Sequence, residues 1–159
     1  MIVGHGDIAS ALQDDPGRLY FASGVSNSLE TRESEYQREK DLLLAQNRSQ
    51  RLVYFSSLSI FYGNTRYIQH KREMEGLVKE NFPKYCIIRL GNITWGSNPY
   101  TLINYLKNNR DAEIQDVYRY IVSKDEFLHS INLIPDFNVE MNVPGRRLKV
   151  ADIVKIFVL

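Results

Sequence analysis

The spacing of apolar residues changes repeatedly along the chain, between the period of two typical of strands and the three-to-four spacing typical of helices. Apolar runs predict strands over 1–3, 18–23, 51–57, 84–91, 118–122 and 137–143. Helical spacing predicts helices over 7–13, 28–46, 65–80, 98–108 and 123–134, and a last apolar segment covers 150–159. Strands that alternate with helices form βαβ units, so we expect an α/β fold with a parallel sheet and helices on both faces.

Polar residues and a proline predict where several helices begin. Ser28 is expected to cap the helix that follows it, and Pro99 to lie in the first turn of its helix. Ser123 and Glu126 form a capping-box pattern. One side of the helix over 28–46 is predicted to carry Tyr36, Lys40, Leu43 and Leu44.

Small and polar residues follow four of the predicted strands. In parallel sheets of this kind, ligands bind beyond the carboxyl ends of the strands, where the connecting loops meet. The sequence therefore predicts a binding site at that edge. The segments expected to form it are Gly4–Gly6, Ala22–Ser23, Ser56–Ser59 and Gly91–Asn92.

Composition favours one compact domain over residues 1–159, because 43% of the residues are hydrophobic and only 25% are charged. The formal net charge of +1 provides no general attraction to nucleic acid or to an anionic membrane, so neither is expected as a partner. The local basic cluster of Arg146, Arg147 and Lys149 is interpreted as a solvated turn.

The single cysteine, Cys86, lies in an apolar run and is predicted to be a buried structural thiol. The first residues lack the pattern of a signal peptide, and no apolar run reaches the roughly 18 residues of a membrane span, so we expect a cytoplasmic setting. His5, His70 and His129 lack ligand-like spacing and predict no metal site. His70 is interpreted as a surface residue of its helix.

The segment Gly4-x-Gly6-x-x-Ala9 lies between a predicted strand and a predicted helix. Such a turn suits a dinucleotide pyrophosphate, but a strand-to-helix turn also requires glycines for structural reasons, and both interpretations stay open. Asp7 suits the positive end of a helix and competes with a bound phosphate. The chain between this helix and the next strand is too short to carry the strand whose terminal acid holds the adenosine ribose.

Tyr67 and Lys71 are four residues apart and share one face of a predicted helix. An ammonium beside a phenol favours the phenolate, so Lys71 is expected to lower the pKa of Tyr67 and to make it a base. Two other pairs with this spacing, Tyr36/Lys40 and Tyr120/Lys124, are interpreted as structural because neither follows a strand that ends in serines.

Four segments together resemble the extended short-chain dehydrogenase/reductases, the family of nucleotide-sugar epimerases and dehydratases. They are GHGDIASAL, LVYFSSLSIFYG, YIQHKREMEGLV and IIRLGNITWG. The order of segments matches over nearly the whole chain. The resemblance implies a Rossmann-like, doubly wound parallel sheet that lacks the second and third strands of the cofactor half, and it marks 92–117 as a vestigial substrate-binding region.

The resemblance also implies a hydride-transfer site that uses NAD or NADP and a nucleotide-sugar-like substrate. Tyr67 would be the general acid/base, and Lys71 would hold the nicotinamide ribose. Ser59 and Asn92 would face the substrate. The other cofactor-binding residues would be Gly4, Gly6, Ala9, Ala22, Ser23 and Ser56.

One departure from the family pattern concerns the catalytic hydroxyl. The position of the family's serine or threonine falls on Leu58, which cannot hydrogen-bond to a reacting oxygen. Adjacent residues of a strand point to opposite faces. Ser57, the candidate catalytic hydroxyl, or Ser59 can therefore replace it only if the strand end bulges or the turn changes register.

Three readings of the sequence remain. The first is a minimal NAD(P)-dependent epimerase, dehydratase or reductase, and the second is a catalytically degenerate Rossmann-fold binding or assembly module. In the third, Tyr67 and Lys71 are only neighbours on a scaffold. Loss of two strands places residues 1–4 at a sheet edge, where unpaired backbone groups favour pairing between two copies in a homodimer.

Overall fold

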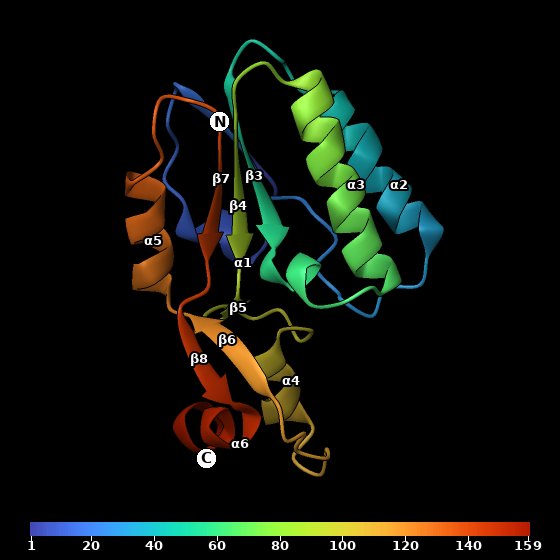
Figure 1. Cartoon of the computed structure of the whole chain (residues 1–159), viewed down its shortest axis with the longest axis vertical. Helices are drawn as coiled ribbons and strands as arrows, with labels where there is room; N and C mark the ends of the chain where they lie inside the picture. The colour runs from blue at the N-terminus through green and yellow to red at the C-terminus, as the bar shows by residue number, and fades with distance from the viewer.

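The computed structural model describes all residues from 1 to 159. Its main layer is a parallel sheet in the order β1-β2-β3-β4-β7 (Figure 1). The bounds of these strands are β1 Ile2–Val3, β2 Arg18–Phe21, β3 Arg51–Ser57, β4 Tyr85–Leu90 and β7 Val139–Val143. The parallel α/β fold expected from the sequence is confirmed.

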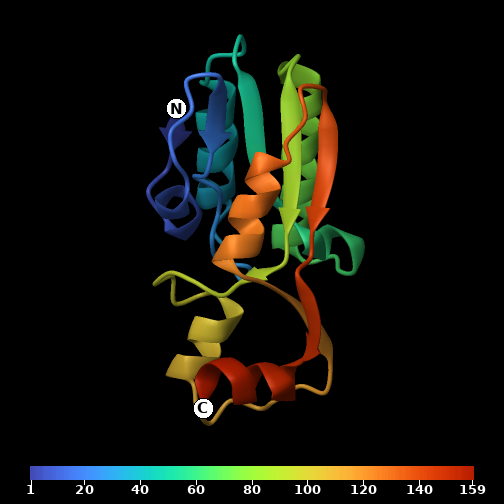
Figure 2. The same cartoon turned by 90° about the vertical axis from the view of Figure 1, so that its left-hand side faces the viewer.

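Helices cover both faces of this sheet (Figures 1 and 2). α1 (Asp7–Ala11) and α5 (Lys124–Asn132) pack on one face, over a core that includes Tyr20, Val53 and Phe127. α2 (Glu33–Leu44) and α3 (Arg66–Asn81) pack on the other, over a core that includes Leu43 and Met74. Because both faces are buried, β3 and β4 are almost continuously apolar rather than alternating.

β1 forms one edge of the sheet and pairs only with β2. The chain leaves β1, makes the short helix α1, and returns directly as β2. No strand lies outside β1, so the expected loss of the second and third strands of the cofactor half is confirmed.

A smaller lobe lies beyond the carboxyl ends of the main strands (Figure 1). Its sheet has the order β5-β6-β8, and its own core includes Ile103, Ile121 and Ile153. The elements of this lobe are β5 Asn92–Ile93, α4 Leu102–Asn108, β6 Tyr118–Val122, β8 Arg146–Lys149, α6 Val150–Ile153 and a π-helical turn over Val154–Val158.

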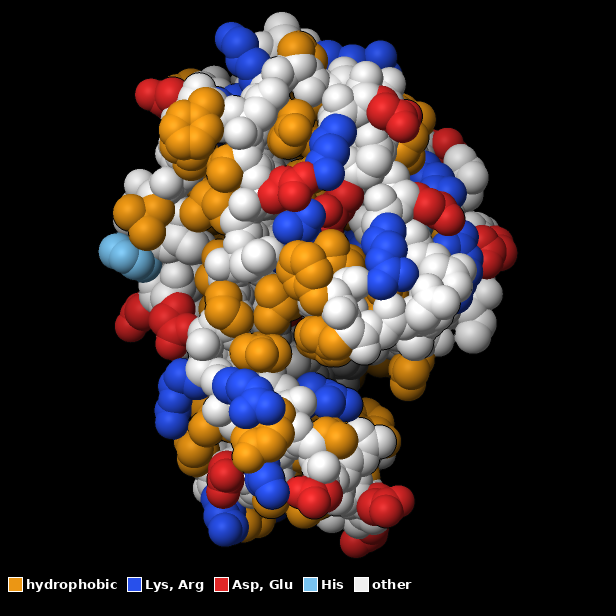
Figure 3. Space-filling model, viewed as in Figure 1, with side chains coloured by type: hydrophobic (Ala, Val, Ile, Leu, Met, Phe, Trp, Pro, Cys, Tyr) orange, Lys and Arg blue, Asp and Glu red, His pale blue; other side chains and the backbone are white.

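The basic cluster interpreted as a turn is instead strand β8, which pairs antiparallel with β6. Lys and Arg side chains gather over these two strands on the face shown in Figure 3. The Arg147 guanidinium lies 3.7 Å from the centre of the Tyr118 ring, and Lys149 pairs with Asp116. The strand escaped sequence analysis because Leu148 is its only apolar residue, too few to produce a period of two.

Two helix starts also differ from expectation. α2 begins at Glu33, with Arg32 rather than Ser28 at the cap position. α4 begins at Leu102, after Pro99, and the Thr101 hydroxyl caps it by accepting from the backbone N–H of Asn104. Ser123 does cap α5, because its hydroxyl accepts from the backbone N–H of Glu126.

The buried side of α2 was partly mispredicted. Tyr36, Glu39 and Leu43 are buried, whereas Leu44 is exposed and Lys40 pairs with Glu73 of α3. The charged Glu39 therefore lies on the buried side of α2, where the apolar Leu44 was expected. No helix of the structure combines the length and the apolar character needed to cross a membrane.

Candidate functional site

A cavity of about 710 Å³ lies at the carboxyl ends of the main strands, between them and the smaller lobe. Most of the residues singled out in the sequence come together here. Those that line it are Gly6, Ala22, Ser23, Ser56, Ser57, Ser59, Tyr67, Lys71 and Asn92. The predicted location of the site at this edge of the sheet agrees with the pocket.

Gly4 and Ala9 do not line the cavity but shape the turn beneath it. Gly4 has a φ of +123°, and a side-chain carbon there would lie 2.2 Å from the carbonyl oxygen of Ala22. Glycine is therefore required for β1 to approach β2. Ala9 is buried, so its small side chain serves the packing of α1.

Ser57 and Ser59 are brought together by a change from strand to 3₁₀ helix. β3 ends at Ser57, and the 3₁₀ turn Leu58–Phe61 starts at the next residue. The Ser57 hydroxyl caps this turn by accepting from the backbone N–H of Ser59 at 3.2 Å. As a result the two hydroxyl oxygens lie 2.6 Å apart at the cavity wall, while Leu58 is buried. The turn provides the change of register that a replacement hydroxyl requires.

Ser56 is oriented by a buried ion pair. Its hydroxyl donates to Glu75 at 2.6 Å, and the guanidinium of Arg89 donates to the same carboxylate at 2.6 Å. Arg89 also pairs with Glu140 of β7. The Ser56 hydroxyl is therefore already hydrogen-bonded within the protein. This bond connects α3 to the middle of the sheet.

Tyr67 lies in the first turn of α3 and lines the cavity, half-buried. Lys71 lies on the same helix face, with its ammonium nitrogen 5.6 Å from the centre of the Tyr67 ring. Burial raises the pKa of Tyr67 above its usual value, Lys71 lowers it, and the charge of Glu39 raises it again. The net shift is upward, so the expectation that Lys71 lowers this pKa overall is wrong for this structure.

Burial of Tyr67 is the main cause of this upward shift, and the charge of Glu39 beside Lys71 adds to it. The Lys71 side chain is itself almost completely buried. Its ammonium donates to both carboxylate oxygens of Glu39 at 3.4 Å and to the Tyr54 hydroxyl at 3.2 Å. Burial alone would lower the pKa of Lys71, but the charge of Glu39, the nearby Tyr67 and the hydrogen bond to Glu39 together raise it. Lys71 is thus a fixed ammonium that is bonded to Glu39 and acts on Tyr67 only through space.

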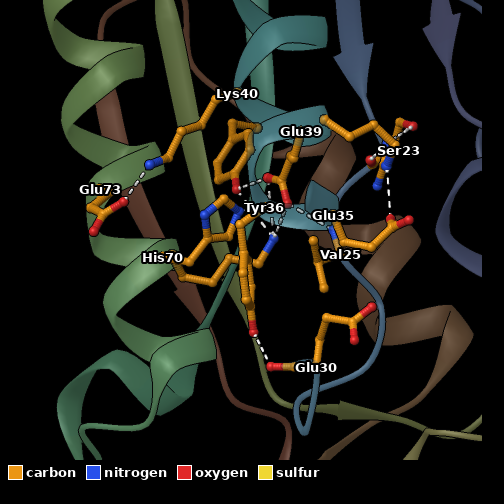
Figure 4. A network of polar contacts seen from close by, with 12 residues as sticks. Ser23, Val25, Glu30, Glu35, Tyr36, Glu39, Lys40, His70 and Glu73 are labelled. Atoms are coloured by element: carbon orange, nitrogen blue, oxygen red, sulfur yellow. Dashed lines mark hydrogen bonds and ion pairs between the residues drawn. The ribbon is translucent and has the colours of Figure 1, made fainter. Parts of the chain in front are cut away.

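Glu39 is the centre of this buried network (Figure 4). Its carboxylate accepts from the Tyr54 hydroxyl at 2.5 Å and from the backbone N–H of Val25 at 2.7 Å. It also lies 3.0 Å from Nε2 of His70. Burial raises the pKa of Glu39, but Lys71 and the hydrogen bonds from His70 and Tyr54 lower it to about 2.

His70 is therefore not the surface residue that was expected. Its side chain is fully buried, with Nε2 facing Glu39 and its ring 4.6 Å from that of Tyr36. Nδ1 of His70 has no hydrogen-bond partner within the protein.

The loop after β2 covers the ion pair and forms part of the cavity wall. Two consecutive residues of α2 hold it, since Arg38 donates to the carbonyl oxygen of Ser23 at 3.1 Å and Glu39 accepts from Val25. A side-chain carbon at Gly24 would lie 2.7 Å from the Lys71 ammonium nitrogen. Gly24 therefore allows the backbone to lie directly over the buried charge.

The far wall of the cavity comes from the smaller lobe. Asn92 donates to the carbonyl oxygen of Tyr120 at 3.0 Å, which fixes its side chain against β6. Arg119 also lines the cavity and pairs with no carboxylate, and sequence analysis missed it. The only sequence signal for Arg119 was that it is a cationic residue within a short predicted strand.

Asp7 connects the glycine turn to the smaller lobe. Its carboxylate accepts from the backbone N–H groups of Ser97 at 3.0 Å and Asn98 at 2.9 Å. The indole N–H of Trp95 donates to the carbonyl oxygen of Asp7 at 3.0 Å. The acidic residue predicted at this helix start therefore binds the loop over 95–98.

No family model matches the chain, and no curated protein matches it in sequence. Solved structures do match. The enzyme WbmG of Bordetella bronchiseptica, in complex with NAD, aligns with a TM-score of 0.66 at 13% identity, over 88% of this chain and 56% of its own. UDP-glucose 4-epimerase of Thermotoga maritima, with UDP-glucose, aligns with a TM-score of 0.67 at 16% identity, over 89% and 60%.

A third match is dTDP-4-dehydrorhamnose reductase of Bacillus anthracis in complex with NADP, with a TM-score of 0.67 and 15% identity, over 88% of this chain and 62% of that one. The chain thus has the fold of NAD-dependent nucleotide-sugar epimerases and of this reductase. It spans less than two thirds of the length of these proteins.

Proposed function

We propose that this chain is a minimal NAD(P)-dependent epimerase, dehydratase or reductase, which acts on a nucleotide sugar through a Tyr-Lys hydride-transfer site. One observation carries the proposal: Ser57, Tyr67 and Lys71 meet at one cavity on a fold shared with enzymes of that class. The fold alone does not carry it, because the same fold serves many reactions.

The residues at the centre of the cavity suit the nicotinamide half of the cofactor. Ala22 and Ser23 offer a small, partly polar wall, and Gly24 brings backbone close to the same space. Tyr67 and the serine pair line the same cavity. When bound there, the nicotinamide would supply or accept a hydride.

The chain's own residues would move the proton. The Tyr67 phenol would give its proton to a carbonyl oxygen during reduction, or take one from a hydroxyl during oxidation. The Ser57 and Ser59 hydroxyls, 2.6 Å apart, would donate a hydrogen bond to that same oxygen. Lys71 would support the phenolate through space, because its ammonium is already bonded to Glu39. A direct contact to a ribose would require it to leave that pair.

The substrate class follows from the neighbours rather than from a motif. WbmG has been crystallised with NAD and UDP, and the Thermotoga epimerase with UDP-glucose. In this chain, Arg119 and Asn92 stand on the wall where a substrate would lie. A guanidinium without a carboxylate partner suits a phosphate group, and the Asn92 amide suits a sugar hydroxyl.

The proposal is tested by calorimetry with NAD and NADP and by turnover of UDP-sugars. Tyr67→Phe should reduce turnover by about 10²- to 10⁴-fold while the melting temperature stays unchanged. Tyr105→Phe, at an exposed position of α4 outside the cavity, is the matched control. If neither NAD nor NADP binds at millimolar concentration, the proposal is refuted.

The edge position of β1 favours a second candidate, a degenerate binding or assembly module. β1 pairs on one side only, so its other side presents backbone groups for pairing with a second copy. This reading predicts a homodimer joined through residues 1–4. Sedimentation velocity tests it, and a strictly monomeric protein that turns over substrate would eliminate it.

A further inference from the structure

The chain has no surface on the outer side of β1 that could bind the adenosine half of a dinucleotide. β1 is the edge strand, and nothing pairs on its outer side. The cavity at this end is lined only by His5–Ile8 of the turn after β1, and its next lining residue along the chain is Phe21. An adenosine placed here would therefore lie on exposed surface and gain little binding energy.

The glycine turn has open space on its cavity side. Gly6 lines the cavity, and a side-chain carbon at this position would meet no atom within 4 Å. The next residue, Asp7, also lines the cavity and carries a carboxylate. A second phosphate beyond Gly6 would approach that negative charge, and α1 is a helix of only five residues. Repulsion between such neighbours is expected to weaken binding by about tenfold.

Asp7 is held where it is by the loop of the smaller lobe. The Asp7 carboxylate accepts hydrogen bonds from two backbone N–H groups of this loop. Asn104 also stabilises the loop by donating to the carbonyl oxygens of Gly96 and Asn98. Gly96 has a φ of +96°, and a side-chain carbon there would lie 2.1 Å from the Asp7 carboxyl carbon. The carboxylate and the loop are in close contact, so Asp7 cannot swing away without breaking these bonds.

The size of the cavity agrees with a smaller ligand. Its volume of about 710 Å³ must hold the reactive half of a cofactor together with a sugar. Single ligands of drug size occupy cavities of about 300–1,000 Å³. A nicotinamide mononucleotide beside a nucleotide sugar suits this space better than a full dinucleotide beside the same substrate.

We propose that this site recognises the nicotinamide mononucleotide half of its cofactor and draws no affinity from the adenosine half, because β1 is an edge and the Asp7 carboxylate repels a second phosphate. The inference rests on the proposed function, since it concerns the same cavity. It changes the ligand class from a dinucleotide to a nicotinamide mononucleotide.

Calorimetry of the full chain with nicotinamide mononucleotide, NAD and ADP-ribose tests this. NAD is expected to bind no more tightly than the mononucleotide and up to about tenfold more weakly, and ADP-ribose should not displace either of them. A dissociation constant for NAD more than about tenfold lower than that of the mononucleotide would overturn the inference. If NAD is the tighter ligand and turnover occurs, only this inference fails. If neither nicotinamide ligand binds, the proposed function fails with it.

Asp7→Asn isolates the effect of the charge. The amide keeps the size of the side chain, and it is expected to favour NAD over the mononucleotide by about three- to tenfold relative to the unmodified chain. Asp111→Asn, at an exposed loop position outside the cavity, removes the same charge as a control and should change neither affinity. Equal changes for both ligands in Asp7→Asn would show that Asp7 does not exclude a second phosphate. If this variant fails to fold, the ligand comparison on the unmodified chain still decides.

Discussion

Glu39 and Lys71 form an ion pair beneath the loop that lines the cavity, with both side chains almost completely buried. The pair joins α2 to α3, and the charges of both partners affect the pKa of Tyr67. A buried pair of this kind contributes little net stability compared with apolar packing, but losing one partner leaves the other charge uncompensated. Its measurable consequences therefore concern both folding and the acid–base chemistry of the cavity.

Glu39→Gln should lower the free energy of unfolding by about 3–5 kcal/mol, because it leaves the Lys71 ammonium buried without a counter-charge. Urea denaturation followed by circular dichroism measures the change. Glu80→Gln, on the exposed side of α3, removes an equal charge and should leave the unfolding midpoint where it was. A midpoint for Glu39→Gln equal to that of the control would contradict the buried pairing.

The same residue predicts how stability depends on pH. The pKa of Glu39 is about 2 in the folded chain, against 4.5 for a free glutamate. Its ionised form therefore stabilises the fold fully above pH 4.5, and this contribution is lost as the pH falls toward 2. The difference in unfolding free energy between the unmodified chain and Glu39→Gln should shrink over this window. A difference that is constant down to pH 2 would be inconsistent with the lowered pKa.

Tyr67 should give an alkaline pH profile. Since burial and Glu39 raise its pKa above 10.0, the phenol is protonated at neutral pH. If it is the base in alcohol oxidation, the rate should rise about tenfold per pH unit and still be rising near pH 10. The reverse reduction uses the protonated phenol and should be insensitive to pH in the neutral range. A profile of oxidation that levels off near pH 7 would argue against Tyr67 as the base.

Removal of the serine hydroxyls should affect turnover unequally. Ser57→Ala removes a hydroxyl at the cavity and also the cap of the 3₁₀ turn, and about a 10²-fold loss of kcat is expected. Ser59→Ala leaves that cap in place and should cost less. Because the two oxygens are hydrogen-bonded, the double variant should fall short of the product of the single effects. Ser34→Ala, on the exposed side of α2, serves as the control, and additive losses would show that the hydroxyls act separately.

Cys86 should react with thiol reagents only when the chain unfolds. Its side chain is buried in β4, and burial raises the pKa of the thiol to about 11. Labelling followed by mass spectrometry should therefore be slow in buffer and complete in urea. A cysteine introduced by Ser34→Cys provides an exposed comparison on the same chain. Labelling of Cys86 as fast as that residue would indicate that the β4 core opens readily.

Much of the fold was predictable because long apolar runs and helical spacing are strong local signals. β3, β4 and α3 were found within a few residues of their ends. β8 was not, because antiparallel pairing with β6 stabilises a segment with a single apolar residue. The start of α2 was also misplaced, since the chain from Ser28 to Arg32 is not helical and Ser28 lines the cavity instead of capping the helix.

The candidate site was predictable where its residues follow a strand or share one helix face, and not where they meet through tertiary contacts. The serines, Tyr67 and Lys71 were located from the sequence. Glu39 and His70 were not, because they are 31 residues apart and meet only when α2 packs beside α3. A signal did exist: Glu39 is three residues from Tyr36 and four from Leu43, so it lies on the stripe that faces the core. A charge on such a stripe indicates a buried partner of opposite sign.

Gly24 makes the charge of the cavity adjustable from a single backbone position. The first side-chain carbon of any other residue at 24 would lie 2.7 Å from the Lys71 ammonium nitrogen, which is the end of a long, flexible side chain. A methyl group introduced by Gly24→Ala would therefore displace the ammonium rather than the sheet, and would weaken its bond to Glu39. A protein engineer could use this position to redistribute a fixed positive charge between the interior and the Tyr67 phenol, without altering any side chain that lines the cavity.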